Sequence, residues 1–155
     1  MELFLLAGNK KYKKPGNEVP FMYSKEGLSE EQIRYFLASC TKGRFEEEIL
    51  MVCIPYALNP DVSPYSLNPD GRKGYVFTKK GIYTDYNVKS AGNDADVKLP
   101  LLYEDIVKCE YEELFPDRVT CILKGGSKVY FDTGNYGQFY CEVINEIVSV
   151  LEGEK

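Results

Sequence analysis

The chain has 155 residues, enough for one domain with a substantial core, and its 44% hydrophobic and 28% charged residues are typical of a globular protein. A net charge of −5 argues against nucleic-acid binding, which depends on neutralising phosphates with Lys and Arg. The absence of His argues against catalysis by a Cys or Ser nucleophile, which lacks its usual base, and against zinc, which needs four clustered Cys or His ligands.

The N-terminal third is predicted to form an arm and one helix. The apolar segment Met1–Ala7 carries Glu2 where a signal peptide has a basic residue, so we interpret it as a strand or a buried arm and expect a cytoplasmic protein. A helix is predicted over 29–40, because Ser29 and Gln32 resemble a capping box. No apolar stretch approaches the roughly 20 residues that cross a bilayer, so no transmembrane segment is expected.

Seven short strands are predicted between residues 49 and 132. The stretch "YVFTKKGIYTDY", residues 75–86, indicates a hairpin whose corner places Gly81 in the left-handed conformation. Gly125 and Gly126 indicate a second hairpin, whereas 87–98 reads as a polar loop. Apolar runs and alternation predict strands over 49–54, 75–79, 82–86, 99–103, 106–111, 119–124 and 128–132.

A second helix is predicted over 137–151, where one stripe of apolar side chains is wide enough to close a core: Tyr140, Val143, Ile144, Ile147 and Leu151. We therefore predict an α+β fold. A seven-stranded antiparallel sheet curls into a partly open barrel, the C-terminal helix caps it, and the N-terminal helix is an addition. The chain is expected to be a single domain, 1–155, with the arm and first helix in 1–45 and the core in 46–153.

The order of these elements resembles the pleckstrin-homology (PH-like) superfold, in its bacterial and GRAM-related forms, over about residues 49–153. The stretches that carry the resemblance are "YVFTKKGIYTDY", "LPLLYEDIVKCEYEE", "VTCILKGGSKVYFDT" and "FYCEVINEIVSVLEG". The N-terminal arm and helix depart from that pattern. The resemblance implies a binding module rather than an enzyme.

Two basic segments are candidate anion-binding sites. Relatives of the superfold often bind inositol phosphates between the first two strands, and the corresponding loop, 56–73, offers Arg72 and Lys73, with Lys79 nearby. A second cluster near the N-terminus consists of Lys10, Lys11, Lys13 and Lys14. At about 1 kcal/mol per Lys, four lysines give only about millimolar affinity for an anionic membrane. We interpret both segments as solvated loops, with peripheral lipid contact as the alternative.

The cysteines and the acidic turn 93–96 carry no predicted chemistry. Cys53, Cys109 and Cys121 fall at apolar strand positions, so they are expected to be buried free thiols. The segment "NDAD" at 93–96 is interpreted as a polar turn, since it lacks the Gly and the twelfth-position Glu of a calcium loop. Neither a metal nor a cofactor is predicted.

Three functional hypotheses remain open. The leading one is a non-enzymatic PH-like interaction module that acts through contact with a protein partner or through self-assembly into a homo-oligomer. It is supported by the 13 Tyr residues, a type enriched at interfaces, and by sheet edges able to pair with another strand. The alternative is a peripheral binder of anionic lipid or of anions, and the third is an enzyme of unknown type.

Overall fold

The computed structural model describes residues 21–24, 30, 48–54, 74–93, 95–112, 114–115, 117–134 and 136–153. The helix predicted over 29–40 lies outside these residues except for Glu30, and so does the predicted arm at 1–7. The described elements, in chain order, are β1 (Phe21–Ser24), β2 (Ile49–Ile54), β3 (Tyr75–Thr78), β4 (Gly81–Thr84), β5 (Val88–Ser90), β6 (Leu101–Leu102), the 3₁₀ turn η3 (Tyr103–Asp105), β7 (Ile106–Tyr111), β8 (Arg118–Leu123), β9 (Lys128–Asp132) and α4 (Gly137–Gly153).

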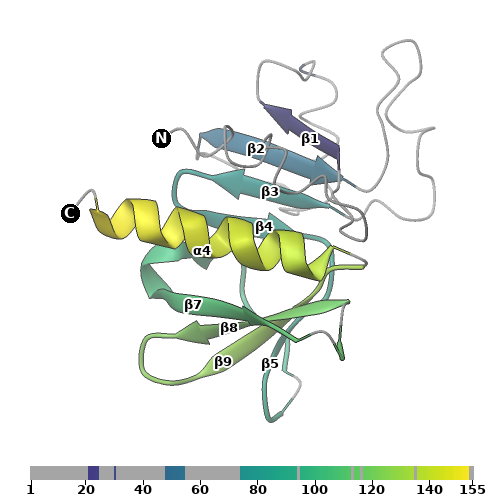
Figure 1. Cartoon of the computed structure of the whole chain (residues 1–155), viewed down its shortest axis with the longest axis vertical. Helices are drawn as coiled ribbons and strands as arrows, with labels where there is room; N and C mark the ends of the chain where they lie inside the picture. The colour runs from purple at the N-terminus through teal and green to yellow at the C-terminus, as the bar shows by residue number, and fades with distance from the viewer. Residues whose placement is uncertain are drawn as a thin grey trace.

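The strands form two antiparallel sheets, where one curled sheet was predicted (Figure 1). Sheet 1 has the order β1-β2-β3-β4-β6 and sheet 2 has the order β5-β9-β8-β7. The chain passes from sheet 1 to sheet 2 at 85–87, and again through η3 after β6. The α+β class, the antiparallel pairing and the C-terminal helix are confirmed, but the described residues contain nine strands in two sheets rather than seven strands in one partly open barrel.

The two strands that were not predicted are β1 and β5, and the predicted strand over 99–103 is reduced to β6. β5 lies within the segment interpreted as a polar loop. It forms because its backbone pairs with β9, some 40 positions later in the sequence, with Val88 opposite Phe131. Sequence periodicity reports the local pattern of side chains, so three residues of mostly polar character cannot reveal such a distant partner.

The predicted β3–β4 hairpin is present, but Gly81 has a different role from the one expected. Thr78 closes the turn, since its Oγ1 accepts the backbone N–H groups of Lys80 (3.2 Å) and Gly81 (3.0 Å). Gly81 does not take the left-handed conformation. A Cβ added there would lie 2.5 Å from the Leu101 carbonyl oxygen, so the close approach of β6 is what requires glycine. The second predicted hairpin is also present, and both glycines at its corner, Gly125 and Gly126, have positive φ.

The core lies where α4 crosses both sheets (Figure 1). β2, β3 and β4 are buried on both faces, whereas the strands of sheet 2 alternate between buried and accessible positions. Tyr75 of β3 is fully buried at the centre, and its ring centroid lies 4.1 Å from that of Tyr140 on α4 and 5.9 Å from that of Phe131 on β9. Four residues of the predicted helical stripe are buried and Leu151 is partly buried, so the stripe is confirmed.

The hydroxyl groups of Tyr75 and Tyr140 are both buried, but they differ in hydrogen bonding. The Tyr75 hydroxyl donates a hydrogen bond to the Asp132 backbone oxygen (3.1 Å). The Tyr140 hydroxyl, on a side chain that is 1% exposed, has no hydrogen-bond partner among the residues that the structure describes. A buried hydroxyl without a partner keeps its desolvation cost, which is of the order of 1–3 kcal/mol.

We expect Tyr140→Phe to raise the free energy of unfolding by about 1 kcal/mol, because it removes the unpartnered hydroxyl and keeps the ring contacts. Tyr75→Phe is the matched control, and it should lower the free energy of unfolding by about 1 kcal/mol since it removes a satisfied hydrogen bond. Urea unfolding followed by circular dichroism measures both. A Tyr140→Phe protein that is less stable than the native protein would show that the hydroxyl has a partner.

The outer edge of β7 is occupied by a side chain of α4. The Asn145 Oδ1 accepts the backbone N–H of Cys109 (2.6 Å), and its Nδ2 donates to the backbone oxygen of the same residue (2.8 Å). The carboxamide therefore takes the place of a neighbouring strand at this point. Covering an edge in this way prevents it from pairing with another chain.

Candidate functional site

A groove of about 650 Å³ lies where the C-terminal turn of α4 meets the β3–β4 turn, η3 and the end of β8. These segments lie at the same end of the molecule in Figure 1. The floor is apolar and is formed by Leu102, Tyr103, Ile106, Val148 and Leu151. The rim is charged and consists of Lys79, Lys80, Lys124, Glu104 and Glu152. We refer to this feature as the lysine-rimmed groove.

Backbone and side-chain hydrogen bonds hold the floor in place. The Tyr103 hydroxyl donates to the Thr78 backbone oxygen (2.8 Å), and its N–H donates to the Lys80 backbone oxygen (3.1 Å). The N–H of Lys124 donates to the Asp105 backbone oxygen (2.8 Å), which ties β8 to η3. Burial raises the pKa of Tyr103 above its ordinary value, so the phenol stays neutral and the floor uncharged. The groove is therefore preformed, as ligand sites usually are.

Two rim lysines carry charges that no ion pair with a described residue compensates. Lys79 forms an ion pair with Glu48 at 2.7 Å, and both side chains are about half exposed. Lys80 and Lys124 are exposed and form no ion pair with any described residue. Positive side chains outnumber negative ones on the rim by three to two, in a chain whose net charge is −5. The rim can therefore accept a negative group from a ligand that fills the floor.

Lys79 is the one predicted site residue that the structure describes, and it lies on the rim of this groove. The other candidates lie outside the described residues: Lys10, Lys11, Lys13, Lys14, Arg72 and Lys73. Sequence reasoning missed Lys80 and Lys124 as site residues. Each lies at a hairpin corner, and both corners point to the same end of the molecule, which only the strand directions reveal.

A second concave region, about 440 Å³ in volume, contains the free thiol of Cys141 among acidic residues. The thiol donates to the Cys109 backbone oxygen (3.4 Å). Burial, followed by the charges of Glu142 and Glu110, raises the pKa of Cys141 from 9.0 to about 11. At neutral pH the thiol is therefore protonated, whereas thiol reactivity depends on the thiolate. Cys141 is therefore held in its less reactive thiol form.

Cys109 and Cys121 are joined by a disulfide, so the prediction of free thiols is wrong for these two residues. They face each other directly across β7 and β8, and their Cα atoms are 4.1 Å apart. The 12-residue separation does not reveal this, because the pairing depends on the register of the hairpin. Cys53 is a buried free cysteine, as predicted, and Cys40 lies outside the described residues.

The turn at 93–96 and the absence of a metal site and of a membrane span were also predicted from the sequence. The Asn93 side chain accepts the N–H of Ala95 at 3.0 Å, which is the geometry of a polar turn, as predicted. Within the described ranges, no group of three or more Cys, Asp or Glu residues is arranged to hold a metal ion. In the same part of the chain, no helix combines the length and the apolar character that crossing a bilayer requires.

Comparisons with protein-family models, with curated proteins and with solved structures find no match to this chain. The resemblance to the PH-like superfold therefore stays a prediction.

Proposed function

We propose that this chain is a non-enzymatic binding module that holds a short segment of a partner protein in the lysine-rimmed groove. The observation that carries the proposal is the combination of an accessible apolar floor with two rim lysines, Lys80 and Lys124, that lack ion pairs within the described chain. The volume of about 650 Å³ is in the range of ligand sites that bind compact apolar groups. A segment with one large apolar side chain next to Asp or Glu would satisfy both the floor and the rim.

Strand addition at a sheet edge is less well supported as the mode of binding. Asn145 occupies the β7 edge at Cys109. At the other edge of sheet 2, Ser90 donates its N–H to the Ala95 backbone oxygen (2.8 Å), so the following loop covers β5. A partner strand needs free backbone donors and acceptors, and these two edges are already engaged. The groove is therefore a better candidate for contact than either edge of sheet 2.

An anionic lipid surface is also less well supported. Such a surface attracts positive charge roughly in proportion to the number of Lys and Arg residues. Glu104 and Glu152 share the rim, and Glu48 pairs with Lys79, so little net positive charge is left for a membrane. A protein segment needs only local complementarity to individual lysines.

Selection of displayed random peptides against the immobilised protein tests the proposal. The selected peptides should share a large apolar residue adjacent to Asp or Glu. The double variant Lys80→Glu with Lys124→Glu should bind them about tenfold more weakly, because two attractions become repulsions. Fluorescence anisotropy with a labelled selected peptide measures the change.

The matched control is the double variant Lys98→Glu with Lys128→Glu, which changes the net charge equally at two exposed lysines outside the groove. It should bind the peptide like the native protein. Equal weakening by both double variants, or peptides without an apolar residue, would contradict a groove site. If the native protein binds phosphatidylserine vesicles and only the Lys80 and Lys124 variant loses this binding, the ligand of the groove is a lipid and not a protein segment.

A further inference from the structure

The loop between β7 and β8 presents two exposed apolar side chains. Leu114 is 87% exposed and Phe115 is 44% exposed, and together with Val107 they are the exposed large apolar residues of the described chain. Solitary exposed apolar residues are ordinary, but two adjacent ones at the end of a hairpin form a projecting apolar surface. We refer to Leu114 and Phe115 as the apolar tip.

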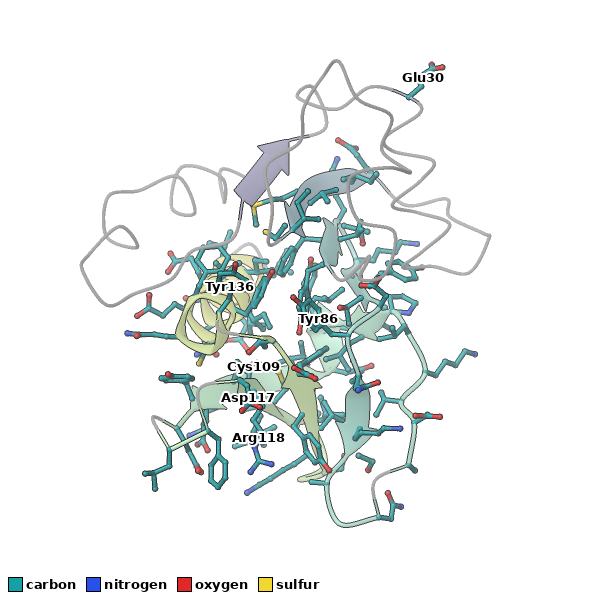
Figure 2. The ribbon with its side chains drawn as sticks, turned by 90° about the vertical axis from the view of Figure 1, so that its right-hand side faces the viewer. Glu30, Tyr86, Cys109, Asp117, Arg118 and Tyr136 are labelled. Carbon is teal, nitrogen blue, oxygen red and sulfur yellow. A yellow bond between two sulfur atoms is a disulfide. The ribbon has the colours of Figure 1, made fainter. Side chains whose placement is uncertain are left out.

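The apolar tip is held in one conformation by its neighbours. The N–H of Phe115 donates to the Glu112 backbone oxygen (3.0 Å), and the N–H of Arg118 donates to the Phe115 backbone oxygen (3.2 Å). The Arg118 guanidinium lies 4.3 Å from the centroid of the Phe115 ring. Figure 2 shows Asp117 and Arg118 on the sheet 2 side of the molecule, away from β1 and β2. A preorganised tip loses little conformational freedom when it binds.

Carboxylates flank the apolar tip. Glu112 precedes it and Asp117 follows it, and both are exposed and form no ion pair with any described residue. The Arg118 guanidinium against the Phe115 ring is the positive group beside these two carboxylates, so the tip combines large apolar side chains with an excess of acidic groups. This is the chemistry that the lysine-rimmed groove accepts, with the floor for the apolar residues and Lys80 and Lys124 for the carboxylates.

The tip cannot reach the groove of its own chain. Ile106, at the start of β7, lines the groove, whereas Tyr111, at the end of β7, leads into the tip loop. A strand of six residues spans about 20 Å, and the two features lie at opposite ends of it (Figure 1). The groove therefore has to receive the tip of a different molecule.

We infer that the partner segment bound by the groove is the apolar tip of a second copy of this chain. The inference rests on the proposed function, since it names the occupant of the same groove. Leu114 and Phe115 contact the apolar floor, while Glu112 and Asp117 lie next to Lys80 and Lys124. The apolar contact provides most of the attraction, and the charges orient the tip.

A contact of this kind is heterologous, because the two copies use different surfaces. After the first contact, the resulting dimer retains one free tip, on one copy, and one free groove, on the other copy. Heterologous contacts produce rings when the rotation between copies closes and open chains when it does not. Association should therefore continue beyond a dimer as the concentration rises.

Sedimentation velocity over a series of protein concentrations tests the inference. The sedimentation coefficient of the native protein should increase with concentration and should decrease when salt is added, since exposed charges are screened within about 8 Å at physiological ionic strength. Leu114→Ser, a change at a side chain that is 87% exposed, should sediment as a monomer at every concentration. The groove variant Lys80→Glu with Lys124→Glu, whose affinity for the tip should fall about tenfold, should remain a monomer at the concentrations where the native protein first associates.

Mixing the two defective proteins provides the decisive measurement. The Leu114→Ser protein retains an intact groove, and the groove variant retains an intact tip. An equimolar mixture should therefore form a discrete dimer and nothing larger, although neither component associates by itself. Val107→Ser, at an exposed apolar residue of β7 outside the tip, is the control and should associate like the native protein.

The outcomes separate this inference from the proposed function. If the native protein remains monomeric at all concentrations, the tip is not the occupant of the groove. Selection of groove-binding peptides would still support a protein-binding module. Association that survives Leu114→Ser also overturns the tip as occupant. If the groove variant associates as strongly as the native protein, the groove is not the site of self-contact. Loss of peptide binding in that variant would still support the proposed function.

Discussion

The free energy of unfolding is expected to fall steeply above pH 9, with a loss of several kcal/mol by pH 11. That loss is comparable to the whole stability of a small domain. Its cause is a set of buried groups that stay protonated in the folded protein. Burial is the largest cause of the raised pKa in each of them: Cys53, Tyr75, Tyr103 and Tyr140.

The direction follows from the protons bound in each state. The thiol has an ordinary pKa of 9.0 and the phenols have ordinary pKa values of 10.0. Below pH 9 the folded and unfolded chains are both protonated at these groups, so stability does not depend on their ionisation. Above those values the unfolded chain releases protons that the folded chain retains. Each such group then favours unfolding by about 1.4 kcal/mol per pH unit.

Urea titrations at pH 8, 9, 10 and 11, followed by circular dichroism, measure the effect. Tyr140→Phe removes one buried phenol and should make the decrease between pH 10 and pH 11 shallower by about 1 kcal/mol. Tyrosine absorbance near 295 nm should show ionisation of the buried phenols only together with unfolding. A stability that is constant between pH 8 and pH 11 would mean that these groups ionise within the fold.

Asn145→Ala is expected to lower the free energy of unfolding by about 3 kcal/mol. Asn145 satisfies both the N–H and the C=O of Cys109, at 2.6 Å and 2.8 Å, in a partly buried position on the β7 edge. Alanine leaves the Cys109 N–H without this partner and leaves the Cys109 C=O only the weak thiol donor of Cys141 (3.4 Å). An unpartnered group that is kept from water costs about 1–3 kcal/mol. The loss should therefore exceed that of an ordinary surface substitution by several fold.

Ser149→Ala, one turn further along α4 at an exposed position, is the matched control and should change stability by less than about 0.5 kcal/mol. Urea unfolding measures both variants, and hydrogen exchange at the Cys109 amide reports the lost contact directly. The exchange rate of this amide should increase in Asn145→Ala and should not change in Ser149→Ala. A cost for Asn145→Ala as small as that of the control would mean that water replaces the carboxamide at this edge.

The candidate site was only partly predictable. Lys79 was a candidate because it lies on the predicted strand after the loop 56–73, where the resemblance to the PH-like superfold implied an anion site. The structure places it on a groove that it shares with Leu151. Lys124 had no local signal beyond its position before Gly125. The groove is formed by the ends of a strand, two turns and a helix, so it depends on how these segments are placed relative to one another. Local sequence patterns do not specify that placement.

Local chemistry was sufficient for several elements of this chain. The apolar run of β2, the hairpin corners and the stripe of α4 were all predicted, because side-chain spacing and turn residues act within a few positions of each other. The tertiary structure decided the division into two sheets, the pairing of β5 with β9, the disulfide and the groove. Each of these joins residues that are distant in the sequence. Their partnership depends on strand register and on the packing of α4 against both sheets, which the linear order of residues does not specify.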